Sequence, residues 1–554
     1  MRLIVVVLEG LKKERKMKKI KEVFLNLLCP AVTYGAITGI ITAVIVLLFK
    51  FVAKYVISFS EDAYLFLRDN LYFVPLVLGA LFGVAYLFAR IYKKQPRVRG
   101  GGIPSSIALI RNIVTFKWLR TLIGVFFMSL TSFLVGVPLG PEGPSVLMGT
   151  AVGKGCTSLM AKRRPAWSGY AMTGGACAGF AVATGASVSG VMFAIEEAHQ
   201  KISPMILIVA TTSVLVAQIV SRVISPLLGL SLSFFPNISI VALSIKDIWI
   251  PLVLGVVMGV FAVVFLKYYH LISKIFTVKL KRIPHHVRIF IVFVLTLAFG
   301  LVSFSFVSTG HDLFPRLLDG SFAIVGLAVL LLVRMTLTLF ANTNKLTGGV
   351  FVPFIVLGAI LSAIIARCIG KVIDFDGYYT ITLMLGITAC ISSMMKMPLT
   401  AIVLSIEVLG CANNVLFVIT VVAVSYIVTE IFGVKGINDS IIDNLVRAQE
   451  ETQERKTVDT HITIKKGSFA EHKHARDVLW PANLLLLSIT PSKTRKTQTD
   501  PQMAKAFHEG DVLHIRYSTF SEEQTRSEIV AIAGEQDFAE VVPAQENDLQ
   551  EIKE

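Results

Sequence analysis

The chain has 554 residues, of which 54% are hydrophobic and only 16% are charged, and its mean hydropathy is +0.71. Soluble domains carry about 25% charged residues, so this composition excludes a purely soluble protein and indicates a polytopic membrane protein. The net charge of +16 suggests nucleic acid as a partner, but the basic residues gather in short runs between apolar segments, at 12–21, 93–99, 162–164 and 279–288. Such runs are typical of cytoplasmic loops, and the lipid bilayer supplies anionic partners for them. We therefore expect no nucleic acid partner.

Residues 1–30 are predicted to form a basic cytoplasmic segment, because the apolar stretch 3–8 is too short for a signal peptide and precedes its basic run. Apolar spans follow, several of them shorter than the ~20 residues that cross a bilayer. Short, glycine-interrupted spans are typical of discontinuous helices around a buried site. We expect spans near 31–56, 74–91, 119–135, 169–183, 187–195, 204–224, 248–269, 287–307, 323–340, 354–358, 377–392, 399–407 and 415–432.

Three glycine-rich segments precede predicted helices inside this apolar sequence. They read GGGIP at 100–104, GPEGP at 140–144 and TGGVFVP at 347–353. Proline suits the first turn of a helix, and a helix that starts inside a membrane presents free N–H groups and the positive end of its dipole. Each segment is therefore a candidate anion site. The alternative is that the glycines only allow a kink or close helix packing.

Glu142 stands inside the second of these segments. A carboxylate within a membrane is costly and is by default a functional candidate. It can occupy the anion site itself and leave when it is protonated. The alternative is an exposed glutamate in a loop outside the membrane.

The membrane part contains an internal repeat. Pro353 lies 209 residues after Pro144, and each proline has a glycine five residues later. The segment 187–196 is similar to 398–407, at an offset of 211 residues, and both end in glutamate. Two motifs with nearly one offset predict two structural repeats, at about 31–240 and 245–448, with a transport site where they meet.

These motifs resemble, in combination and in order, those of the CLC family of chloride channels and proton-coupled chloride antiporters, over about 31–448. The family motif G-S-G-I-P corresponds to 100–104, G-R-E-G-P-x-x-x-x-G to 140–149, and G-x-F-x-P to 349–353. The double glutamate after a small-residue helix corresponds to 196–197, and A-P-L-T-G-I-x-L-x-x-E to 397–407.

The resemblance implies an all-helical membrane fold of two inverted repeats and a homodimer with one anion pathway in each subunit. Glu142 matches the gating glutamate, and Glu197 matches the internal proton-transfer glutamate of the antiporters. Alternatively, Glu197 is a cytosol-facing carboxylate without a role. The positions that match anion-binding residues are Gly101, Gly102, Ile103, Gly143, Val350, Phe351 and Asp439, and the N–H groups of Val350 and Phe351 match the amides that bind the central anion.

Three positions depart from the family pattern. Gly101 stands where the family usually has a serine that donates to the anion, and Pro141 replaces the arginine beside the gate. Asp439 aligns with a late tyrosine of the family. An acid on an anion path is unfavourable unless it is protonated or turned away, so we expect a looser, wetter central site or one tuned to another anion.

The polar tail is predicted to hold a linker at 449–475 and a small α/β domain at 476–554. Strands are expected at 483–489 and 511–517 and a helix at 522–532. The segment 508–513 (HEGDVL) resembles the TrkA-C module of potassium-transport regulators. That resemblance implies a regulatory domain with a small-molecule ligand. An unliganded assembly domain is the alternative.

The sequence as a whole predicts a proton-coupled chloride antiporter of the plasma membrane, with both termini cytoplasmic. The alternatives are a passive anion channel and a variant selective for fluoride or nitrate. A ligand-sensing receptor would rest on the tail alone. We expect neither an enzyme nor a cofactor, because the spans show no nucleophile–base or metal constellation, and the six cysteines lie singly in or beside apolar sequence as core residues.

Overall fold

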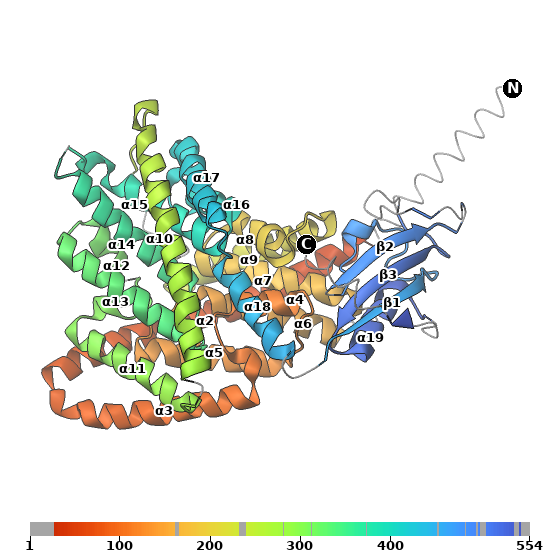
Figure 1. Cartoon of the computed structure of the whole chain (residues 1–554), viewed down its shortest axis with the longest axis horizontal. Coiled ribbons are helices and arrows are strands. Elements are labelled where there is room, and N and C mark those ends of the chain that lie inside the picture. The colour runs from red at the N-terminus through yellow and green to blue at the C-terminus, as the bar shows by residue number, and fades with distance from the viewer. Residues whose placement is uncertain are drawn as a thin grey trace.

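The computed structural model consists of a large helical part and a small sheet domain (Figure 1). The expected N-terminal segment falls outside the described residues except for its last four, as do the basic run at 162–164 and the end of the tail. The structure describes residues 27–160, 165–231, 240–280, 282–311, 313–372, 374–450, 454–481, 483–492, 494, 497–498, 506–536 and 542–543.

The predicted boundary between the two repeats, at about 240–245, divides the helical part into two halves. The first half contains α2 (Cys29–Asp69), α3 (Val74–Lys94), α4 (Ile103–Ile110), α5 (Trp118–Val135), α6 (Glu142–Met160), α7 (Ser168–Thr184), α8 (Ser187–Phe193), the π-helical turn η5 (Ala194–His199) and α9 (Pro204–Leu227). The second half contains α10 (Trp249–Lys274), α11 (His285–Val302), α12 (Leu313–Leu318), α13 (Ile324–Thr343), α14 (Phe351–Ile369), α15 (Tyr379–Met395), α16 (Pro398–Glu407), α17 (Val415–Ile431) and α18 (Ile437–Glu450).

The helices have the lengths and surface of a multi-pass membrane protein. Within the described residues, eight helical segments are long and apolar enough to cross a membrane. Large apolar side chains such as Phe59, Leu76 and Leu227 are exposed on the outside of the helical part, where lipid can solvate them. The expected short helices are confirmed, since α4, α8 and α16 have 8, 7 and 10 residues.

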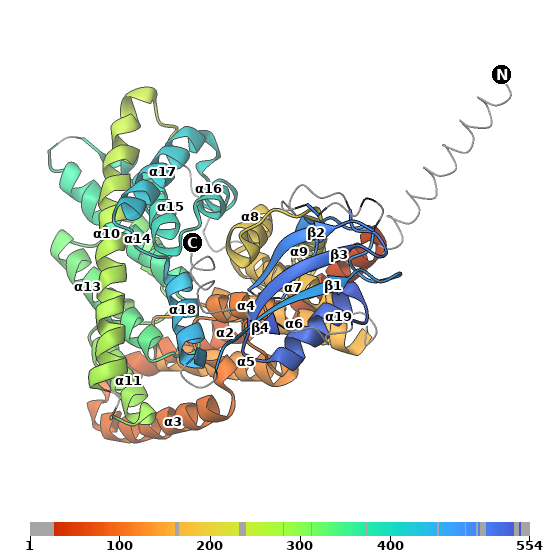
Figure 2. The same ribbon diagram turned by 45° about the vertical axis from the view of Figure 1, so that its right-hand side comes forward.

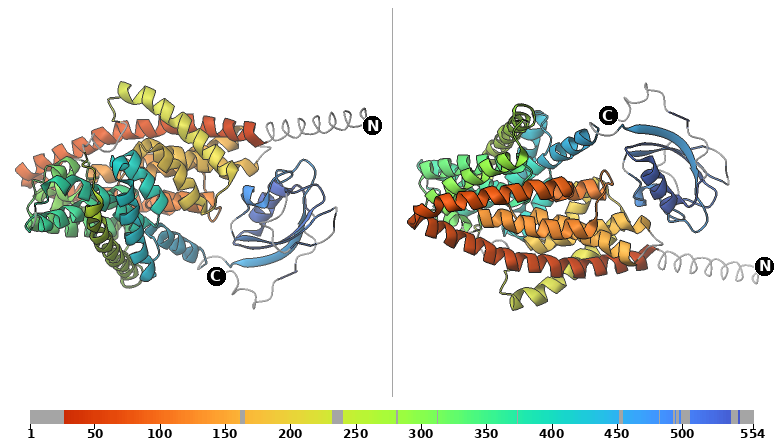
Figure 3. Two further views of the ribbon diagram at one scale, coloured as in Figure 1. Left: turned by 90° about the horizontal axis from the view of Figure 1, so that it is seen from above. Right: turned by 90° about the horizontal axis from the view of Figure 1, so that it is seen from below.

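The longest helix differs from its expected span. α2 continues to Asp69, well beyond the predicted end at residue 56. Its polar second half is held by Tyr64, whose hydroxyl donates to the Val135 carbonyl at 2.7 Å. Seen from below, α2 runs across the helical part from the sheet domain to the opposite side (Figure 3).

Glycines set the close packing of α6 against α7. A Cβ atom on Gly149 would lie 2.0 Å from the Gly175 carbonyl oxygen, and one on Gly179 would lie 2.3 Å from the Ser145 carbonyl oxygen. The two helices therefore run antiparallel in backbone contact. α2 crosses this pair, because its Thr42 methyl group would lie 3.1 Å from that same Gly149 Cβ.

The sheet domain contains an antiparallel sheet in the order β2-β3-β1-β4. Its elements are β1 (Lys456–Thr463), β2 (Leu484–Thr490), β3 (Val512–Thr519), α19 (Glu522–Ala533) and β4 (Val542–Pro543). Figure 2 shows α19 beside the sheet. Val458, Ile462, Ile515 and Ile529 share its core. β2, β3 and α19 match their predicted positions within two residues, whereas the predicted linker at 449–475 is wrong in part. It contains β1, whose buried residues alternate with charged and polar ones and so leave no apolar run.

The sheet domain packs against the first turn of α7. The Tyr170 hydroxyl donates to the Asp477 carbonyl and accepts from the Leu479 N–H. The rings of Trp167 and Phe469 meet edge to face with centroids 5.5 Å apart. The start of α7 thus marks the domain side of the helical part, and the end of α7 marks its far side.

Candidate functional site

The three glycine-rich segments meet in one place. Gly140 and Gly349 pair as an antiparallel bridge, with two N–H to carbonyl bonds of 2.7 Å each. The Gly348 N–H donates to the Gly100 carbonyl at 3.4 Å. The segments before α4, α6 and α14 are therefore joined through their backbones, and the two halves meet at this glycine junction.

The junction has no room for side chains at two positions. A Cβ on Gly143 would lie 1.8 Å from the Gly101 carbonyl oxygen, and one on Gly102 would lie 2.1 Å from the Gly143 carbonyl oxygen. Gly102 also has a positive φ of 80°, which favours glycine. The glycines thus serve close packing, and this packing brings the starts of three helices together.

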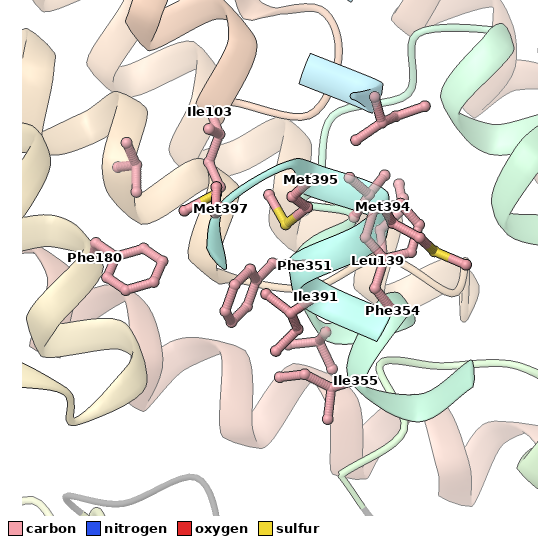
Figure 4. Packing of buried hydrophobic residues seen from close by; sticks show 14 of the residues in the cluster. Ile103, Leu139, Phe180, Phe351, Phe354, Ile355, Ile391, Met394, Met395 and Met397 are labelled. Carbon is pink, nitrogen blue, oxygen red and sulfur yellow. The ribbon is translucent and has the colours of Figure 1, made fainter. Parts of the chain in front are cut away.

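The helix starts at the junction differ in whether their backbone N–H groups are free to bind an anion. Val350 is the N-cap residue of α14 and Phe351 its first residue, and within the described residues their N–H groups have no hydrogen-bond acceptor. Both groups stand at the positive end of a 19-residue helix, which suits an anion. The N–H group of Ile103 is not free, because it donates to the Gly101 carbonyl at 3.0 Å. Ile103 therefore contributes only its buried side chain to the junction (Figure 4).

Glu142 begins α6 at this junction and is only 1% exposed. Its Oε2 atom is buried and has no hydrogen-bond partner within the described residues. The same oxygen would lie 2.6 Å from a Cβ on Gly140, so the carboxylate folds back over the glycine junction. The alternative of an exposed loop glutamate is wrong.

Glu197 lies in the turn η5 and is 6% exposed. Its Oε1 atom accepts a 2.6 Å hydrogen bond from the Asn438 amide on α18. Arg111 holds the same turn, because its guanidinium donates to the Glu197 and Ala198 carbonyls at 2.7 and 2.8 Å. Asp439 is half-buried in the first turn of α18 and interacts electrostatically with Arg111 and Glu197.

The two carboxylates lie toward opposite ends of α7. His199 ends the turn that carries Glu197, and its ring nitrogen is 2.8 Å from the Thr173 hydroxyl near the start of α7. Lys201 follows and donates to the Val478 carbonyl of the sheet domain at 3.3 Å. Glu197 is therefore on the domain side. Glu142 precedes Ser145, which packs near the end of α7, so it is on the far side.

Aromatic rings connect the glycine junction to the turn that carries Glu197. Phe351 meets Phe180 edge to face at 5.3 Å, and Phe180 stacks on Phe193 at 5.6 Å. Figure 4 shows Phe351 between Phe180 and Ile391, with Met397 above them. These side chains carry no proton-binding group, so a proton passing between the two carboxylates along this row requires water.

Glu196 has a different environment from its neighbour Glu197. Its carboxylate accepts from the Leu399 and Thr400 N–H groups at 2.8 and 2.7 Å and from the Thr400 hydroxyl at 2.6 Å. Glu407 does the same for α8, accepting from the Val188 and Ser189 N–H groups at 2.8 and 2.9 Å and from the Ser189 hydroxyl at 2.9 Å. Each half thus caps the short helix of the other, and we call this pair of contacts the reciprocal cap.

Sequence reasoning missed Asn438, Arg111 and the partners of Glu196 and Glu407. Asn438 adjoins the predicted Asp439, but no sequence signal connects it to Glu197, 241 residues away. Among the described residues, no group of three or more His, Cys, Asp or Glu side chains is placed to hold a metal ion.

Comparisons with known proteins agree with this fold. The chain is 24% identical to the H(+)/Cl(−) exchange transporter ClcA of Vibrio parahaemolyticus over 432 residues, 76% of this chain and 91% of that protein. It is 25% identical to ClcA of Klebsiella pneumoniae over 440 residues, 76% of this chain and 90% of that protein.

Solved structures share the architecture. A slow cyanobacterial Cl−/H+ antiporter superposes with a TM-score of 0.67 at 22% identity, over 76% of this chain and 98% of that one. A CLC-type fluoride/proton antiporter superposes with a TM-score of 0.60 at 20% identity, over 73% and 95%. The family described as Voltage gated chloride channel matches residues 82–430, more than half of the chain. The chain therefore belongs to the voltage-gated chloride channel (CLC) family of membrane anion transport proteins.

Proposed function

We propose that the protein exchanges chloride for protons across the plasma membrane, as a homodimer with one anion pathway in each subunit. The observation that carries the proposal is Glu142, a buried carboxylate with an unpartnered oxygen at a junction of three helix starts. A carboxylate in that position competes with a transported anion for the same positive helix ends.

Protonation of Glu142 couples the two ions. While it is ionised, its carboxylate neutralises the helix starts and excludes the anion. When it takes a proton, it loses its charge, and the anion binds at the free N–H groups of Val350 and Phe351. Amides and helix ends bind an anion without a full opposite charge, so release stays fast.

Glu197 supplies the proton from the domain side. It is buried, as a proton carrier inside the membrane must be, and the Asn438 amide orients it. Because Glu142 and Glu197 lie toward opposite ends of α7, each carboxylate exchanges protons with one side of the membrane. The basic runs between the apolar segments support a cytoplasmic position for the domain side and both termini.

Two features support a second candidate, an exchanger with little preference among small anions. Gly101 offers no hydroxyl at the glycine junction, and Asp439 adds a negative charge near Arg111. A wet site of this kind favours neither chloride nor nitrate strongly. For the tail we propose a regulatory domain of the TrkA-C type that binds a small molecule, because the domain contacts α7 directly.

Purified protein in liposomes tests the proposal with a chloride gradient and a pH electrode. Exchange predicts that an outward chloride gradient drives protons uphill. Glu142→Gln should keep anion flux and abolish proton movement, whereas Asp62→Asn, an exposed carboxylate on α2, should change neither. Chloride flux without proton movement in the native protein would show a passive channel. No ion flux at all would contradict the proposal.

A further inference from the structure

Lys50 is a half-buried cation in the middle of α2, and no role assigned above uses it. Its ammonium group donates to the carbonyls of Val182 and Ala183, at 3.2 and 3.3 Å. These carbonyls belong to the last turn of α7, where the helix dipole favours a cation. An ammonium group has three N–H donors, so one remains when two are taken by carbonyls.

The packing register of α6 and α7 places Lys50 at the gate. Gly149 contacts Gly175, and the helices run antiparallel, so a residue seven positions before Gly149 faces one seven positions after Gly175. Those residues are Glu142 and Val182. Val182, to whose carbonyl Lys50 donates, therefore lies opposite the start of α6, where Glu142 stands.

Electrostatics agrees with the register. Lys50 interacts with Glu142 and also with His311, an exposed residue in the loop before α12. Lys50 therefore lies between the buried gate and the loop before α12. An ion that enters from the far side meets this lysine next to the gate.

We propose that Lys50 is a fixed cation on the anion path, which binds the permeating anion at the far-side mouth before Glu142 admits it. This inference rests on the proposed transport function and adds a second anion position to it. A weakly held anion beside Glu142 is released onto the helix starts when the carboxylate is protonated. An ammonium held by two carbonyls suits such a position, because the dipole partly offsets its charge and limits the affinity.

The competing explanation is that Lys50 only caps α7. Lys54, one turn further along α2, provides the matched control. It donates to the Gly229 carbonyl just beyond the end of α9 at 3.1 Å. It is therefore also a lysine on α2 at a helix end, but its ammonium group donates to the segment after α9 and not to the last turn of α7. A lysine that acts only as a cap should behave like Lys54.

The experiment measures chloride flux into liposomes at increasing chloride on the far side, for Lys50→Met, Lys50→Arg and Lys54→Met. Each variant is made in the native protein and in Glu142→Gln, and its folding is checked by gel filtration. Lys50→Met should raise the half-saturating chloride concentration about threefold to tenfold in both backgrounds, the effect of removing one charge near a wet site. Lys50→Arg and Lys54→Met should leave it unchanged.

An effect of Lys50→Met that vanishes in Glu142→Gln would overturn the proposal, because Lys50 would then act only on the gate. An unchanged half-saturating concentration in both backgrounds would overturn it as well. The proposed function fails differently, through the absence of proton-coupled flux in the native protein.

Discussion

The reciprocal cap predicts a measurable loss of stability when one glutamate is removed. In Glu196→Ala, the Leu399 N–H, the Thr400 N–H and the Thr400 hydroxyl lose their acceptor. Leu399 is exposed, but Thr400 is fully buried. Loss of an N-cap costs about 0.5–2 kcal/mol, and a hydrogen bond to a charged group contributes about 1.5–3 kcal/mol. We expect Glu196→Ala to lower the free energy of unfolding by about 3 kcal/mol.

The expected shift in melting temperature follows from the size of the helical part. With an unfolding entropy of about 2.1 cal/mol/K per residue over residues 27–450, a loss of about 3 kcal/mol lowers the melting temperature by roughly 3 °C. Glu407→Ala should give a similar shift, because it leaves the equivalent three donors of α8 unpaired. Glu196→Gln keeps one acceptor oxygen and should fall between the native protein and Glu196→Ala.

Thermal unfolding of the purified protein in detergent, followed by gel filtration, measures these shifts. Asp62→Ala on the exposed face of α2 is the control and should not change the melting temperature. At a temperature where the variants are folded, Glu196→Ala should still couple protons to chloride, because Glu197 is intact. An unchanged melting temperature together with lost proton coupling would refute the structural role of Glu196 and place it on the proton path.

The remaining predictions concern the junction and the inner carboxylate. Glu197→Gln should slow proton movement at least tenfold, while chloride binding measured by calorimetry stays within about twofold of the native value. Asn438→Ala should slow proton movement less, since it removes only the hydrogen bond that orients Glu197. A loss of chloride binding in Glu197→Gln as large as its loss of proton movement would contradict a separate proton path. Gly143→Ala should prevent folding into a monodisperse protein, because the new Cβ would lie 1.8 Å from a backbone oxygen, whereas Gly79→Ala, with nothing within 4 Å of its Cβ, should fold normally. The structure has room for a side chain in Gly101→Ser, since a Cβ on Gly101 would have no contact closer than 3.7 Å. A new hydroxyl that faces the site should tighten chloride binding by about 1.5 kcal/mol, or roughly tenfold. Unchanged affinity and selectivity would show that Gly101 does not face the anion.

The sequence predicted the features that leave a local pattern. Glycine and proline mark the three helix starts, and two nearly equal offsets, of 209 and 211 residues, predict the repeat that contains Glu196 and Glu407. The contacts across the repeat leave no such pattern, because Glu196 caps a helix about 200 residues away. β1 was not predicted, because charged and polar residues separate its buried residues and leave no run of apolar ones. A role for Lys50 was not predicted, because the sequence does not show that the end of α7 lies beside this lysine.

The repeat also separates residues that hold the fold from residues that carry charge through it. Glu196 and Glu407 are equivalent in the two halves and make equivalent bonds, as a structural lock between halves requires. By the same offsets, Glu142 corresponds to Phe351 and Glu197 corresponds to Val408, so both proposed proton carriers occur in the first half alone. In the proposed mechanism the proton and the anion share Glu142, whose carboxylate lies at the glycine junction between the halves. The anion does not use the part of the proton route that leads to Glu197, toward the opposite end of α7. In the proposed mechanism, segments from both halves form the anion site, and the two carboxylates found only in the first half provide the proton coupling.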